Sequence, residues 1–192
     1  MDQHVYNEYL AILREEIVPA LGCTEPIAIA YASAKARSIL GCLPEHITVK
    51  CSGNIIKNVK AVIVPTTGDM KGIETSAVLG AVGGNPDKKL EVLVGVTEED
   101  LALTRELLKK KICSVELIEG VSSLQIIVEM TAGNESSLVE IAFSHTNIVR
   151  IERCFSKRGC PFKTQRKRIA PCSTSRISTP SPQPSIWKTS PT

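Results

Sequence analysis

The first part of the chain carries apolar side chains at helical spacing. They recur every three or four residues, which predicts an amphipathic helix with one face toward a core. These positions are Tyr6, Leu10, Leu13, Ile17 and Leu21. Gly22 is typical of a helix C-terminus, and Thr24 is a suitable N-cap for a second helix that runs to about Leu40. Cys23 therefore lies in a short joint between two expected helices.

The middle of the chain changes between strand and helix patterns. Residues 46–52 (HITVKCS) alternate apolar and polar side chains, and residues 59–65 (VKAVIVP) form a second β-rich run, which ends at a proline. Residues 89–96 (KLEVLVGV) fit a strand or a helix equally well. Helices are expected over residues 68–84 and 97–111.

The next part of the chain consists of β-rich runs that follow one another without a helix between them. These runs are residues 113–119, 123–130, 138–144 and 147–153. Residues 131–137 (TAGNESS) are typical of a hairpin loop. We therefore expect an α+β fold, in which N-terminal helices precede a mainly antiparallel sheet with packed helices.

Composition places this body among aliphatic globular proteins. The chain has 192 residues, 43% of them hydrophobic, with a mean hydropathy of +0.06, which suits one domain with a real core. The first residues do not resemble a secretory signal, and the most apolar run is too short to span a membrane. We expect a cytoplasmic protein. Its seven cysteines include no CxxC pair, and no disulfide framework is expected.

Charge divides the chain in two. Of its 23 Lys+Arg and 20 Asp+Glu, residues 154–192 hold 8 bases and no acid, which leaves 15 bases and all 20 acids in residues 1–153. The net charges are therefore +8 and −5. The second part also holds six of the 11 prolines and shows no periodicity. We predict a folded region over residues 1–153 and a basic, Pro/Ser-rich tail over residues 154–192 that is disordered or derived from a frameshift.

Three interpretations of the tail compete. A basic arm would bind nucleic acid or another polyanion, but aromatic residues are not interleaved with the bases. A metal site would use Cys154, Cys160 and Cys172, whose spacing matches no strong zinc pattern. An out-of-frame translation explains the abrupt change in composition best, and nucleic acid is not expected as a partner.

Cys23 is the first candidate for chemistry. A helix N-terminus favours an anion, so it lowers the pKa of a nearby thiol and makes the thiolate available as a base or nucleophile. The negative charge of Glu25 acts in the opposite direction and raises the pKa of the thiol. On the residues alone, a buried structural cysteine is the favoured interpretation.

Polar side chains in turns supply the other candidates. Ser52 and Asn54 lie in a polar turn, and Thr67 lies in the segment PTTG ahead of a helix, so each fits the binding of a carboxylate. His145 and Asn147 lie in the segment SHTN between two strands. Each of these segments taken alone is equally explained as a surface turn or a structural histidine.

Four blocks together resemble a known family. They are PALGCTEPIAIAYA, CSGNIIKNVKAVIVPTTG, KGIETSAVLGAVGG and SHTNIV. In order and spacing they are similar to L-cysteine desulfidase and its uncharacterised bacterial relatives, akin to the α-subunit domain of iron-sulfur L-serine dehydratases. The likeness covers roughly residues 5–153.

The resemblance implies a lyase that eliminates the β-substituent of a small L-amino acid, such as L-cysteine or L-serine, to form pyruvate. It also implies a [4Fe-4S] cluster whose open iron acts as a Lewis acid. Cys23 then matches the catalytic base. Ser52, Asn54, Thr67, His145 and Asn147 match residues that hold the substrate.

One departure from the family changes this expectation. The cluster cysteines of the family belong to a C-terminal helical half that has no counterpart here, and the ligand role is not carried onto the tail cysteines. We therefore expect a truncated chain without activity that does not bind the cluster. The alternative is a non-catalytic binding protein whose basic tail contacts a polyanion. Membrane partners are not expected, and homo-oligomerisation stays open.

Overall fold

The computed structural model describes residues 2–17 and 19–155. Helix α1 (Gln3–Glu16) comes first, followed by α2 (Thr24–Leu40), strand β1 (His46–Ser52), α3 (Gly53–Val59) and α4 (Ile73–Gly83). A 3₁₀ segment, η1 (Pro86–Glu91), and α5 (Glu98–Lys109) precede the remaining strands. These are β2 (Cys113–Ile118), β3 (Gln125–Ala132), β4 (Glu135–Ala142) and β5 (Ile148–Phe155).

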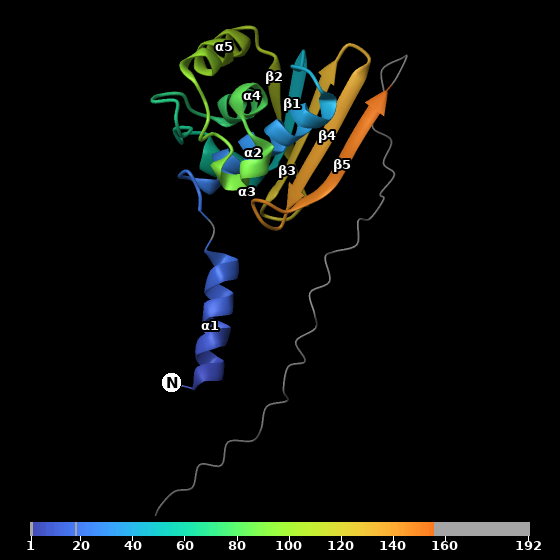
Figure 1. Cartoon of the computed structure of the whole chain (residues 1–192). Helices are drawn as coiled ribbons and strands as arrows, with labels where there is room; N and C mark the ends of the chain where they lie inside the picture. Colours follow the sequence, from blue (N-terminus) through green and yellow to red (C-terminus); the bar gives the residue numbers. More distant parts are fainter. Residues whose placement is uncertain (1, 18, 156–192) are drawn as a thin grey trace, which may run out of the picture.

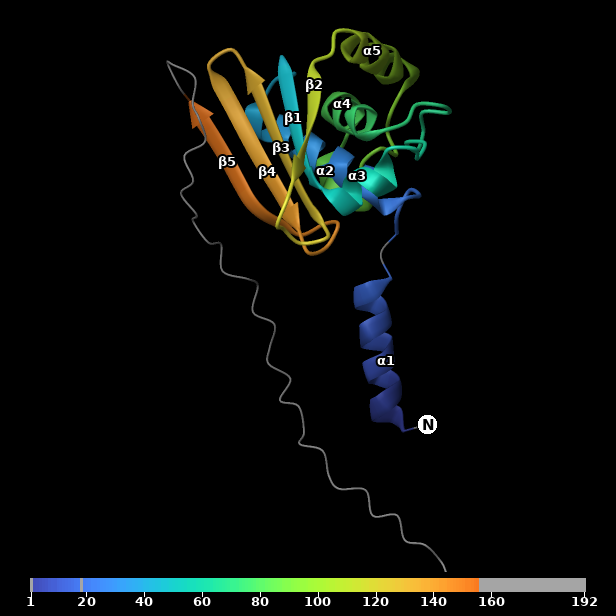
Figure 2. The same ribbon diagram turned by 180° about the vertical axis from the view of Figure 1, so that it is seen from behind.

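The five strands form one sheet in the order β2-β1-β3-β4-β5. Strands β1 and β2 are parallel, and every other neighbouring pair is antiparallel. Helices α2, α3 and α4 contact one side of this sheet, and α5 packs on α4 (Figure 1). The view from behind shows these helices on the same side of the sheet (Figure 2). The expected α+β fold is confirmed.

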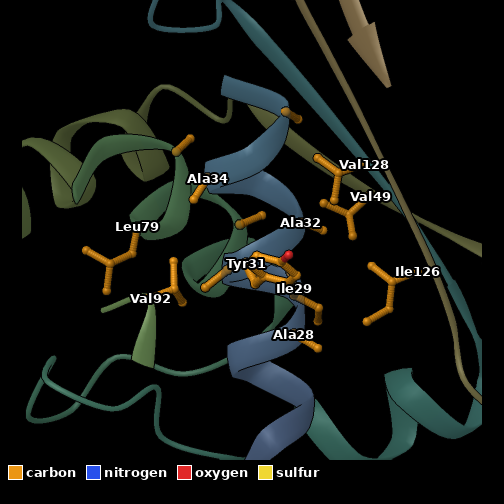
Figure 3. Close-up of a cluster of buried hydrophobic side chains, with 14 of the residues drawn as sticks. Ala28, Ile29, Tyr31, Ala32, Ala34, Val49, Leu79, Val92, Ile126 and Val128 are labelled. Atoms are coloured by element: carbon orange, nitrogen blue, oxygen red, sulfur yellow. The ribbon is translucent and has the colours of Figure 1, made fainter. Parts of the chain in front are cut away.

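Helix α2 is the centre of the core. It packs against β3 and β4 on one side and against α4 on the other, and apolar side chains surround it (Figure 3). Val49, Ile126 and Val128 supply the sheet side, whereas Leu79 and Val92 supply the opposite side. Residues 26–34 of α2 are all buried, so in this part of the helix small and apolar side chains occupy every face rather than one stripe.

Strand periodicity explains which face of the sheet is buried. In β1, Ile47, Val49 and Cys51 are buried, while Thr48 and Lys50 point to the helix-free face. The same alternation holds along β3. The free face carries charges, including Lys50, whose Nζ lies 2.9 Å from Glu129 Oε1 on the neighbouring strand.

The structure corrects several expected boundaries. The first helix ends at Glu16, well before Gly22, and Cys23 rather than Thr24 is the N-cap of α2. Residues 59–65 form no strand, because α3 uses Val59 to cover the core and only Ile63 forms an isolated bridge, with Lys71. Residues 89–96 are mostly 3₁₀ helix and turn.

No helix in residues 2–17 and 19–155 is both long enough and apolar enough to cross a membrane. The expected tail, residues 154–192, begins two residues too early, because Cys154 and Phe155 belong to β5. The rest of the tail, residues 156–192, lies outside the described residues.

Candidate functional site

The N-terminus of α2 lies at one end of the sheet. Ser137 Oγ, early in β4, donates to the carbonyl of Ala36, late in α2, at 2.9 Å. The chain directions therefore place the start of α2 beside the end of β4. The β4–β5 loop and α3, which follows the end of β1, meet at this same end of the sheet.

A carboxylate forms the centre of this region. The Cys23 thiol donates to Glu25 Oε2 at 3.2 Å, and the Thr24 hydroxyl donates to the same oxygen at 3.4 Å. From α3, Asn58 Nδ2 donates to Glu25 Oε1 at 3.3 Å. Cys23, Glu25, Asn58 and His145 are called the Glu25 cluster below.

The pKa of the Glu25 carboxyl is shifted by opposing causes. Partial burial acts to raise it, but hydrogen bonds from Cys23, from its own backbone N–H and from Asn58, together with the charge of His145, outweigh burial and lower the pKa. His145 is thus close enough to interact electrostatically with the Glu25 carboxyl. The carboxylate of the Glu25 cluster stays ionised at neutral pH.

The Cys23 thiol shows the opposite effect. Burial raises its pKa, and the hydrogen bond to Glu25 and the negative charge of that carboxylate add to this, against a smaller lowering by the Glu25 N–H. Burial and the Glu25 carboxylate together raise the pKa of the thiol in spite of the helix N-terminus, so a thiolate is not favoured here. Cys23 is exposed, so its interpretation as a buried structural cysteine is wrong.

Ser52 is a structural residue in this arrangement. Its hydroxyl donates to the carbonyl of Ser123 at 2.7 Å and accepts from the N–H of Gln125 at 3.4 Å. It therefore holds the end of β1 to the start of β3. Asn54 is exposed and lies one turn before Asn58 on α3, so the two amides share a helix face.

Thr67 is buried within its own loop. Its hydroxyl donates to the carbonyls of Val64 at 2.7 Å and Met70 at 3.2 Å. This loop borders the Cys23 joint, because a Cβ on Gly22 would lie 3.2 Å from Pro65 Cγ. Thr67 shapes the border of the cluster, and its hydroxyl is already engaged.

The β4–β5 loop carries the last two candidates. Asn147 Nδ2 donates to the carbonyl of Ala142 at 3.0 Å, and the Asn147 N–H donates to the carbonyl of Ser144 at 3.2 Å. These bonds close the loop and set the position of His145. The structure thus brings Cys23, Asn54 and His145 toward one region and gives Ser52, Thr67 and Asn147 local structural bonds.

Glu25 and Asn58 are the residues that sequence reasoning missed as site members. Asn58 was visible as the second asparagine of the segment SGNIIKN, four residues after Asn54, a spacing that places both on one face of a helix. Glu25 was noted only as a first-turn acid. Its contact with Asn58 joins segments 33 residues apart, so no local pattern could reveal it.

Metal ligation finds no support in the described part of the chain. Residues 2–17 and 19–155 contain no group of three or more His, Cys, Asp or Glu side chains that could hold a metal ion. Burial raises the pKa of both Cys51 and Cys113 to about 12, which keeps these thiols protonated. Of the proposed tail ligands, Cys160 and Cys172 lie outside the described residues.

A separate hollow lies at the opposite end of the sheet. It has a volume of about 300 Å³ and is lined by Glu74, Leu108, Lys111 and Cys113. None of the candidates from the sequence lies there. The Glu25 cluster therefore remains the candidate site.

Comparisons with known proteins find relatives that are similar to this chain in sequence. No family model matches it. It is 54% identical over 149 residues to a UPF0597 protein of Lachnoclostridium phytofermentans and 49% identical over 153 residues to one of Treponema denticola. These alignments cover 78% and 80% of this chain but 36% of each relative, so the chain spans about a third of the length of the relatives it matches.

These comparisons correct the identification drawn from the four sequence blocks. The relatives bear the name of an uncharacterised family, which is neither L-cysteine desulfidase nor an iron-sulfur dehydratase. The assignment as a truncated β-eliminating lyase is therefore wrong. The frameshift hypothesis and the alternative of a polyanion-binding protein also lack support. The chain is similar, over residues that make up most of its length, to UPF0597 proteins.

Proposed function

We propose that the Glu25 cluster binds a small L-amino acid through its ammonium group. The observation that carries the proposal is the Glu25 carboxylate, kept ionised at the surface by hydrogen bonds from Cys23 and Asn58. A fixed anion of this kind favours a cationic partner. Charge-assisted hydrogen bonds are also stronger than hydrogen bonds between neutral groups.

The surroundings of Glu25 supply groups for the rest of an amino acid. Asn54 presents an exposed amide on the same face of α3 as Asn58, and its NH2 group can donate to a carboxylate. His145, when protonated, adds a positive charge near the same place. Cys23 offers a neutral thiol against the side chain of the ligand.

The test uses two molecules of the same carbon skeleton. L-alanine carries an ammonium where L-lactate carries a hydroxyl, so a site built on Glu25 binds the first and not the second. Isothermal titration calorimetry of the whole chain under reducing conditions measures both, with L-serine and L-cysteine as further ligands. Absence of binding by all three amino acids, or equal affinity for L-lactate and L-alanine, would refute the proposal.

A pair of variants assigns the binding to the cluster. Glu25→Gln keeps the shape but removes the charge, and we expect the affinity to fall roughly tenfold or more, the scale of one charged hydrogen bond. Glu99→Gln is the matched control, because Glu99 is also the second residue of its helix and is exposed on α5. Equal losses in both variants would place the site elsewhere.

A further inference from the structure

Strand β5 lies at one edge of the sheet. It is the last strand in the order, and among residues 2–17 and 19–155 it pairs with β4 alone. Every second residue of such a strand turns its N–H and C=O away from the sheet, which makes the edge a template for another strand.

The strand carries few of the features that protect an edge. It is eight residues long and contains no proline. Its register shift against β4 falls at Glu140/Ile141, near the start of β5, and leaves the rest regular. Ile151 is 42% exposed. The residues before and after Ile151 are Arg150 and Glu152, which share the helix-free face. Arg150 Nη2 lies 2.7 Å from Glu152 Oε1.

We propose that β5 pairs antiparallel with β5 of a second copy of this chain. A two-fold axis through Ile151 places Arg150 of each copy opposite Glu152 of the other, because the positions one before and one after the axis face each other. The two isoleucines then meet on the other face. At positions 150–152 the strand is therefore complementary to itself in both charge and apolar contact, while Arg153 lies opposite Val149 of the other copy.

The four charges fix the register of this pairing. Each arginine has a glutamate beside it on its own strand and another across the interface, so opposite charges alternate around the group. Shifting one strand by two residues relative to the other removes at least one of the cross-strand pairs. The opposite edge strand, β2, lacks this property, because Glu116 is its one charged side chain.

The test reverses one charge at a time. Glu152→Arg gives a strand with two arginines at these positions, and Arg150→Glu gives one with two glutamates. Each variant alone would bring four like charges together, and we expect its self-association to weaken roughly tenfold or more. An equimolar mixture of the two restores every opposite pair, so we expect a mixed dimer.

Analytical ultracentrifugation of the whole chain measures these masses at several concentrations, and circular dichroism checks that each variant is folded. Arg105→Glu, an exposed charge on α5, is the control and keeps the wild-type association. A monomeric wild type, a dimer indifferent to both reversals, or a mixture that stays monomeric would each overturn the proposal.

Discussion

At the scale of single residues, burial and hydrogen bonding shift the pKa values of Cys23 and Glu25 in opposite directions. The proton between Cys23 and Glu25 stays on sulfur, since the pKa of the thiol is raised and that of the carboxyl is lowered. A neutral thiol beside an anion binds and orients, whereas a thiolate would attack or abstract a proton. The protonation state therefore favours recognition over nucleophilic chemistry at this position.

Removing the carboxylate changes the reactivity of the thiol. In Glu25→Gln the negative charge beside Cys23 is lost while its burial persists, so its pKa falls and more thiolate is present at any given pH. We expect faster alkylation of Cys23 by iodoacetamide between pH 7 and 9, followed by mass spectrometry of its peptide. The exposed Cys42 is the internal reference. An unchanged rate profile at Cys23 would contradict the role given to Glu25.

The lowered pKa of Glu25 also links stability to pH. A carboxyl that is more acidic in the folded state stabilises the protein above its unfolded pKa, and this contribution is lost as pH falls through the folded pKa. We expect urea denaturation of the wild type to show a loss of stability below the ordinary value of 4.5 that Glu25→Gln lacks. The effect is small because the group is largely hydrated. Identical pH profiles would show that Glu25 is unperturbed in the folded state.

At the scale of elements, the close approach of α2 and α4 sets the thickness of the core. A Cβ on Gly80 would lie 2.3 Å from the carbonyl oxygen of Ala30 and 2.6 Å from its Cα. Backbone atoms cannot give way as a side-chain end can. Gly80 is thus required by contact rather than by a turn, and the small side chains of α2 serve the same packing.

Gly80→Ala is therefore expected to push α4 away from α2. We predict a loss of about 3 kcal/mol in the free energy of unfolding, the upper part of the range for overpacked cores, measured by chemical denaturation. Gly95→Ala is the control, since nothing lies within 4 Å of the added methyl group. A loss of under about 1 kcal/mol for Gly80→Ala would show that the helices separate easily.

The elements differ in how far the sequence predicts them. The last four strands and α5 are indicated by local signals, such as the alternation along β3 and the capping box of Thr97 and Asp100. The hairpin turn is shorter than the expected residues 131–137, because β3 continues to Ala132 and β4 begins at Glu135. The prediction for residues 59–65 was wrong because Val62, Ile63 and Val64 have β-propensity, whereas among the described residues only Ile63 pairs, in a single bridge with Lys71. β-Propensity without a partner does not make a strand.

The candidate site was predictable only in part, for a similar reason. Cys23 and His145 come from local chemistry, and both lie in the region that the structure assembles. Ser52 and Thr67 were polar residues in turns, and the structure engages them with backbone carbonyls. Which polar side chains remain available depends on contacts between distant segments, and such contacts leave no periodic signal.

At the scale of the whole molecule, α1 stands apart from the α+β body. Both views show it away from the sheet and the other helices (Figures 1 and 2). Its large apolar side chains are exposed, with Tyr9 56% and Ile12 55% exposed. The body from Leu21 onward, in contrast, closes its own core around α2.

Deleting residues 2–17 should therefore leave the stability of the body unchanged. Because the apolar side chains of α1 cover nothing in the core, we expect the free energy of unfolding to change by less than about 0.5 kcal/mol. Ile27→Ala, which empties a fully buried position of α2, is the comparison and should cost roughly 2–5 kcal/mol. Urea denaturation followed by circular dichroism measures both. A deletion as costly as Ile27→Ala would mean that α1 packs on the body in solution, and its exposed stripe would then belong to the core.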